Sequence, residues 1–234
     1  MKEQKDNANI RYDPINGLRM IACIGIVLMH IKVNSGYEFG RGTLNYVIDT
    51  FTNFVYLFMV ISSFGMCCGY YEKIRNSEIN IETFYKKRIK KIMPFLLFLI
   101  IIDVVYEHST VALIEGLSET TLMFNFLQKD IEVIGVAWYI GLTFVFYMIF
   151  PYFVFLFSNK KRAWLTTIMA VMMNFISIGY FKVTRNNMFY SFIYFCLGGM
   201  IYLYKERIIQ MLKNKRFIGI GLILVSILVY YNKR

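Results

Sequence analysis

The sequence predicts an all-α protein, a bundle of membrane-spanning helices with a cytoplasmic N-terminus, and three observations lead to this fold class. First, the 234 residues are 57% hydrophobic and 18% aromatic but only 18% charged, whereas soluble domains carry about 25% charged residues. Second, the apolar residues form long runs and the mean hydropathy is +0.49. Third, the basic residues are distributed unevenly between these runs. One integral-membrane domain over residues 1–234 is therefore expected.

The apolar runs predict about seven transmembrane helices. Residues 1–14 are polar and carry no cleavable signal, so the first helix is expected to stay in place. The apolar pieces within the acidic segment 103–133 are too short to span, and we expect them to lie along the surface or to re-enter. The predicted helices are 15–33, 46–70, 92–106, one that begins near residue 136, 163–181, 188–204 and 217–231.

The distribution of basic residues predicts the orientation. All but seven of the 26 lysines and arginines lie before the first helix, at its base, or in every second loop after it. The positive-inside rule then places the N-terminus in the cytoplasm of a multi-pass membrane protein. The net charge of +11 arises from these segregated basic residues. The expected partner is therefore the bilayer and not nucleic acid. The seven exceptions are Lys32, Arg41, Lys129, Lys182, Arg185, Lys233 and Arg234.

Arg19 and His30 are the residues of the first helix that need an explanation. Ten residues stand between them, which places both side chains on one face of a helix, roughly 16 Å apart along its axis. A charged group in the hydrocarbon costs about 2.5 kcal/mol or more and normally faces the interior of a bundle. A functional site is therefore expected on this face. The alternative is that both side chains reach the two membrane surfaces and only anchor the helix.

Two further groups of residues allow a structural and a functional interpretation. Five of the six residues 86–91 are cationic, in a predicted cytoplasmic loop 71–91 that precedes Pro94. Such a run sets orientation or contacts anionic lipid, or it binds phosphate, with Arg88 suited to two parallel hydrogen bonds. Trp138 and Tyr139 are expected at the outer interface, where an aromatic belt explains them. All four cysteines lie in apolar segments, and no metal site is expected.

The stretch N-G-L-R-M-I-A-C-I-G-I-V-L-M-H, which ends at His30 and contains Arg19, resembles the opening helix of acyltransferase family 3. These are bacterial membrane acyltransferases that O-acetylate cell-surface glycans. Residues 58–64 resemble the family's F-F-x-x-S-G-F motif, and residues 84–94 resemble its R-x-x-R segment followed by proline, here with Arg88 and Lys91. Residues 138–151 resemble W-x-L-x-x-E-x-x-F-Y-x-x-x-P.

Three positions depart from the family pattern. Asn16 stands where the family often has aspartate, Ser63 replaces a glycine, and Thr143 occupies the position of a frequent glutamate. If that glutamate supports catalysis in relatives, this chain needs another carboxylate, such as Asp49 or one from the acidic outer segment. The family also has about three more helices than the seven predicted here, so the resemblance suggests a truncated member.

The resemblance implies transfer of an acyl group, most often acetyl, from cytoplasmic acyl-CoA to a hydroxyl of a carbohydrate or lipid-linked glycan, across the bacterial cytoplasmic membrane. Acetyl-CoA would be a co-substrate, with no bound cofactor. His30 is the expected general base or acyl carrier. Two alternatives stay open, a non-enzymatic carrier or flippase for surface glycans and an inactive truncated family member. Arg19 joins His30 as a catalytic residue, Arg88, Lys91 and Lys87 are expected to bind the donor, and Trp138 and Tyr139 are expected to contact the acceptor.

Overall fold

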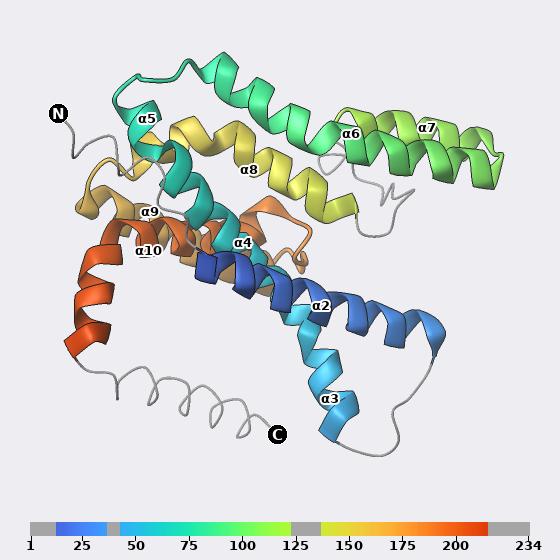
Figure 1. Cartoon of the computed structure of the whole chain (residues 1–234), viewed down its shortest axis with the longest axis horizontal. Helices are drawn as coiled ribbons and strands as arrows, with labels where there is room; N and C mark the ends of the chain where they lie inside the picture. Colours follow the sequence, from blue (N-terminus) through green and yellow to red (C-terminus); the bar gives the residue numbers. More distant parts are fainter. Residues whose placement is uncertain (1–12, 37–42, 123–136, 215–234) are drawn as a thin grey trace.

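The computed structural model describes residues 13–36, 43–122 and 137–214, and every regular element in these ranges is helical (Figure 1). The predicted all-α fold is confirmed. The predicted seventh helix, 217–231, lies outside the described residues. In chain order the elements are α2 (Asp13–Ser35), α3 (Thr43–Thr50), the 3₁₀ helix η2 (Phe51–Asn53), α4 (Phe54–Met66), the π-helix η3 (Cys67–Tyr71), α5 (Glu72–Arg75), α6 (Ile81–Glu107), α7 (Thr110–Thr120), α8 (Ala137–Leu156), α9 (Lys160–Gly179) and α10 (Met188–Asn214).

Within these ranges, four helical stretches are long and apolar enough to cross a membrane. They are Ile15–Ser35, Leu44–Arg75, Ala137–Leu156 and Lys160–Gly179. The first, second, fourth and fifth predicted helices correspond to them. α6 and α10 correspond to the third and sixth, and each has 27 residues, enough for about 40 Å at 1.5 Å per residue. The structure is therefore a membrane-type helix bundle.

α4 is the central element of the bundle, and it packs against both α2 and α10. The α4–α10 contact is close because Gly198 lies on it. A Cβ atom at Gly198 would come within 2.4 Å of the Val60 carbonyl oxygen and 2.6 Å of the Ser63 Cβ. The Ser63 hydroxyl donates a hydrogen bond of 2.6 Å to the carbonyl of Phe195 across the same interface. Small residues thus allow the two backbones to meet, as expected in membrane bundles.

The basic run 86–91 was predicted to lie in a loop, and that prediction is wrong. α6 begins at Ile81, so these residues form its first turns, and Pro94 lies inside the helix. Asn80 caps the helix by accepting a hydrogen bond of 3.1 Å from the Glu82 amide. Lysine and arginine are good helix formers, and an ion pair of 2.6 Å joins Lys86 to Glu82 one turn earlier. The cations consequently have fixed directions around one helix.

α7 and the aromatic core complete the described fold. α7 packs along α6 (Figure 1), where a Cβ at Gly116 would come within 2.7 Å of Ile100. Both predicted placements for this segment, along the surface or re-entrant, stay predictions, because the packing of α7 on α6 agrees with either. The core is aromatic, and Phe153 and Phe195 lie at its centre with ring centroids 4.9 Å apart. This aromatic core packs α8 against α10, and the start of α8 consequently lies beside α4.

Candidate active site

Arg19 lies inside the bundle, on the face of α2 that packs against α4. This face carries the buried Ala22 and Met29, whereas Met20 and Ile24 on the other side are at least half exposed. The Arg19 guanidinium lies against Gly65 of α4, where a Cβ would stand 2.9 Å from its Nη2 atom. Its Nη1 donates a long hydrogen bond of 3.4 Å to Asn16. The predicted inward direction of this side chain is therefore observed.

The Tyr139 side chain lies close to Arg19. Its hydroxyl lies beside Ser62 of α4 and Thr143 of α8. Its ring meets Phe58 edge-on at 6.4 Å. A belt residue would point to lipid and water at the membrane surface, so that interpretation of Tyr139 is wrong. The structure instead defines a polar cluster between α2, α4 and α8, made by Arg19, Ser62, Tyr139 and Thr143.

Arg88 is the cation of α6 that turns inward. Its guanidinium carbon lies 4.3 Å from the ring centre of Tyr70 and 5.3 Å from that of Tyr147. The Nε atom is buried and has no hydrogen-bond partner within the described ranges. Stacking on two tyrosines holds the group in place and leaves its donors available. Tyr147 in turn lies near Tyr139, which places Arg88 next to the polar cluster.

Lys87 and Lys91, the other predicted donor residues, do not share this interior position. Lys87 lines a cleft of about 620 Å³ at the start of α6, together with Lys73, Tyr70 and Gly69. Lys91 is exposed to the surroundings. The π-helix η3 forms one wall of the cleft and presents Tyr70 to Arg88. Such π segments frequently mark functional sites, but nothing in the sequence separates this one from ordinary α-helix.

His30 is half-buried and lies on the same face of α2 as Arg19, about three turns further along. Because α2 is continuous from Asp13 to Ser35, the predicted spacing holds. No hydrogen bond or ion pair of His30 is found among the described residues. Two residues later, Lys32 makes an ion pair of 2.6 Å with Asp49. Asp49, one candidate for the missing carboxylate, is thus occupied by that lysine.

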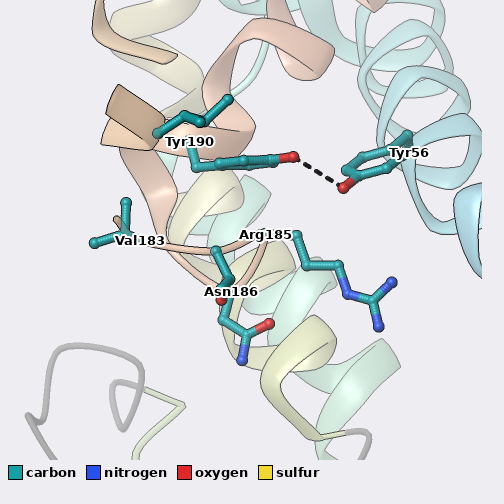
Figure 2. A pocket seen from close by; sticks show the side chains of 7 residues that line it. Tyr56, Val183, Arg185, Asn186 and Tyr190 are labelled. Carbon is teal, nitrogen blue, oxygen red and sulfur yellow. Dashed lines mark hydrogen bonds between the residues drawn. The ribbon is translucent and has the colours of Figure 1, made fainter. Parts of the chain in front are cut away.

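Trp138 is buried inside the bundle and not at a lipid-facing belt, so the belt interpretation is wrong for it too. Its ring lies 5.4 Å from the guanidinium of Arg185, in the segment between α9 and α10. Arg185, Tyr56 and Tyr190 line a second cleft, of about 490 Å³ (Figure 2). Sequence reasoning missed these three residues. The one available signal was the position of Arg185 on the basic-poor side of the chain.

The fold and the site together place the chain in the class of helical membrane proteins with a polar interior. Arginine, tyrosine and hydroxyl side chains from several helices form that interior. The family model for the acyltransferase domain of acyltransferase family 3 matches residues 12–232. The chain therefore belongs to acyltransferase family 3 and is a membrane acyltransferase, as the resemblance of the four motifs predicted. No curated protein and no solved structure matches this chain.

Proposed function

We propose that the protein transfers an acetyl group from cytoplasmic acetyl-CoA to a hydroxyl of a carbohydrate or lipid-linked glycan. One observation carries the proposal. Two guanidinium groups, those of Arg19 and Arg88, lie in the bundle without an ion pair to any carboxylate in the described ranges. Both arginines are half-buried. Removing a cation from water without a partner is costly, and a polyanionic ligand offsets that cost. Acyl-CoA is such a ligand.

The donor enters from the end of the bundle where α6 begins. Lys73 and Lys87 line the cleft there and contact the CoA phosphates as mobile point charges. Arg88 is adjacent to that cleft, because Tyr70 both lines the cleft and stacks on the Arg88 guanidinium. Arg19 then contacts polar groups further along the pantetheine arm. Lys91 adds positive charge at the surface, where phosphates first approach.

His30 acts at the other end of the path. An extended thioester arm that passes Arg19 runs along the polar face of α2 toward His30. A histidine exchanges protons near neutral pH, so its imidazole accepts the proton of the acceptor hydroxyl while that oxygen attacks the thioester carbonyl. The new carbon–oxygen bond forms, the carbon–sulfur bond breaks, and the CoA thiolate takes up a proton as it leaves. In the variant mechanism His30 carries the acetyl group transiently.

This chemistry assigns the two ends of the bundle to two sides of a membrane. The N-terminus and the basic start of α6 face the cytoplasm, where acyl-CoA is made, and the segment between α9 and α10 faces outward. The distribution of lysines and arginines supports this orientation. The site of action is then the bacterial cytoplasmic membrane, with glycan precursors or finished surface glycans as acceptors.

The test is transfer of labelled acetyl from acetyl-CoA to the glycan fraction of membranes that contain the protein. We expect His30→Ala to lower the rate by 10²- to 10⁴-fold, the usual contribution of a general base. Ile31→Ala is the matched control, because Ile31 is the next residue of the helix and is 56% exposed, away from the face that carries Arg19 and His30. It should leave the rate unchanged. Full transfer by His30→Ala would remove the assignment of His30, and no transfer by the intact protein would contradict the proposed reaction.

A further inference from the structure

We propose that the cleft between α4 and the α9–α10 segment binds the acceptor through an anionic group, a carboxylate or phosphate on a sugar unit, with Arg185 as the recognising cation. The proposal rests on the acetyl transfer proposed above and names its acceptor class. The cleft has a volume of about 490 Å³, is open on one side, and is lined by Tyr56, Ile178, Val183, Thr184, Arg185, Asn186 and Tyr190. Small-molecule sites usually have volumes of about 300–1,000 Å³, so this cleft is large enough for a sugar unit.

Arg185 is held ready for a ligand. Its Nη1 donates a hydrogen bond of 2.7 Å to the Thr52 hydroxyl, and its guanidinium lies 5.4 Å from the centre of the Trp138 ring. The Ser191 hydroxyl fixes the backbone by donating a hydrogen bond of 2.6 Å to the Arg185 carbonyl. No carboxylate pairs with Arg185 among the described residues. Its remaining nitrogen donors suit the two oxygens of a carboxylate or phosphate.

The neighbouring tyrosines provide a surface for a sugar ring. The Tyr56 and Tyr190 hydroxyls are hydrogen-bonded at 3.0 Å, and this pair lies beside Arg185 and Asn186 in Figure 2. Tyr56 also stacks on Tyr194 with ring centroids 4.4 Å apart. Asn174 anchors this wall by donating a hydrogen bond of 2.6 Å to the Tyr190 carbonyl. Rigid aromatic faces next to amide and hydroxyl groups favour carbohydrate, which has apolar faces and polar edges.

The cleft also connects to the polar cluster through consecutive residues. Trp138, which lies under Arg185, is followed by Tyr139, whose hydroxyl contacts Ser62 and Thr143 near Arg19. A ligand bound to Arg185 therefore lies at the start of α8, next to the polar cluster that contains Arg19, whereas Arg88 stacks on Tyr147 near the middle of the same helix. This arrangement allows acceptor and donor to be bound along the same helix.

Trp138 offers a direct measurement of binding. The chain has two tryptophans, and Trp164 is half exposed on α9, outside the cleft. In the full-length Trp164→Phe protein, the fluorescence of Trp138 reports on Arg185. We expect a saturable change with glucuronic acid, glucose 6-phosphate or both, and none with glucose. The response to the two anionic sugars separates a carboxylate from a phosphate. Equal responses to glucose, or no response to either anion, would overturn the proposal.

Variants in the same background complete the test. Arg185→Gln should weaken the fluorescence response at least tenfold, and Arg185→Lys, which keeps the charge, should retain part of it. Lys182→Gln removes another cation of the same segment and should change nothing, since Lys182 does not line the cleft. If the protein binds the anionic sugar but neither it nor any variant transfers acetyl, only the proposed reaction is contradicted. If the Arg185→Gln variant transfers acetyl as fast as the unmodified protein, only this inference is contradicted.

Discussion

The Arg19 guanidinium occupies the space that a side chain at position 65 would need. Because a Cβ at Gly65 would lie 2.9 Å from Nη2, at the flexible end of the arginine, Gly65→Ala displaces the guanidinium at little cost to the fold. We expect the KM for acetyl-CoA to rise about tenfold, which corresponds to about 1.4 kcal/mol. Steady-state kinetics and a melting curve of the purified protein check both parts.

Gly17→Ala is the matched control for Gly65→Ala. Gly17 lies on α2 close to Arg19, but a Cβ there meets nothing within 4 Å. Its KM should stay at the wild-type value. If both alanine variants behave alike, the position of the Arg19 guanidinium does not matter for donor binding.

Arg88 and Lys91 were both predicted to bind the donor, and their surroundings now predict effects of different size. Arg88 stacks on Tyr70 and Tyr147, whereas Lys91 is exposed. Arg88→Ala should therefore raise the KM for acetyl-CoA at least tenfold, and Arg88→Lys should not restore it, because a lysine cannot form the same planar stack. Lys91→Ala should change the KM by less than threefold. A larger loss with Lys91→Ala than with Arg88→Ala would reverse the assignment.

The placement of single residues could be predicted where helix periodicity governs it. Arg19 and His30 lie on one face because α2 is continuous, and their separation in the sequence is enough to predict this. Tyr139 could not be placed in this way. The belt rule depends on the residue type and its distance from the end of a run, but the position of Tyr139 beside Ser62 and Thr143 depends on how α8 is rotated against α4.

At the scale of helices, the close contact of α4 and α10 predicts a large effect of one methyl group. Gly198→Ala would bring a Cβ within 2.4 Å of the Val60 carbonyl oxygen and 2.9 Å of the Phe64 amide nitrogen, and backbone atoms cannot move aside individually. We expect the free energy of unfolding to fall by about 1–3 kcal/mol, as for other overpacked interfaces. The melting temperature in detergent measures this effect.

Gly179→Ala provides the comparison for Gly198→Ala. Gly179 ends α9, and a Cβ there meets nothing within 4 Å. Its melting temperature should be unchanged or slightly raised, since alanine favours helix more than glycine does. Equal melting temperatures for the two variants would show that α4 and α10 separate without cost.

The boundaries of α6 illustrate what hydropathy alone leaves out. A hydropathy pattern places the start of a helix where the apolar run starts, near residue 92, because it registers transfer into lipid and not backbone hydrogen bonding. The helix in fact starts at Ile81, behind the Asn80 cap. The signals were present in the sequence, an asparagine followed by Glu82 and a Lys86 one turn later, but they belong to the rules for caps and ion pairs.

At the scale of the whole molecule, the proposed orientation predicts which ends a membrane-impermeant reagent can reach. Tyr180 is 81% exposed after α9, and Asn76 is exposed between α5 and α6. In intact cells a maleimide that cannot cross membranes should label Tyr180→Cys and not Asn76→Cys. After permeabilisation it should label both. The unmodified chain is the control for the native cysteines, and the reverse pattern would invert the orientation.

The cleft lined by Tyr56, Arg185 and Tyr190 shows the limit of prediction for the whole molecule. Arg185 and Tyr190 are close in the sequence, but Tyr56 comes from a distant part of the chain, and no local pattern relates it to them. Their meeting follows from two tertiary contacts, the close approach of α4 to α10 at Gly198 and the hydrogen bond from Arg185 to Thr52. The membrane fold and the first polar face could be predicted because composition and period determine them, whereas this cleft depends on the packed bundle.

The hydrogen bond from Ser63 to Phe195 spans 132 positions of the chain, and this separation has a consequence for biosynthesis. A ribosome produces α2, α4 and α8 well before α10, so the helices that carry Arg19, Ser62 and Tyr139 can associate while Ser63 still lacks its partner. Nascent chains that end after α9 would contain the proposed donor contacts but would lack Arg185 and Tyr190, which form one wall of the cleft of about 490 Å³. The order of synthesis therefore provides the helices of the proposed donor side first and completes the proposed acceptor side last.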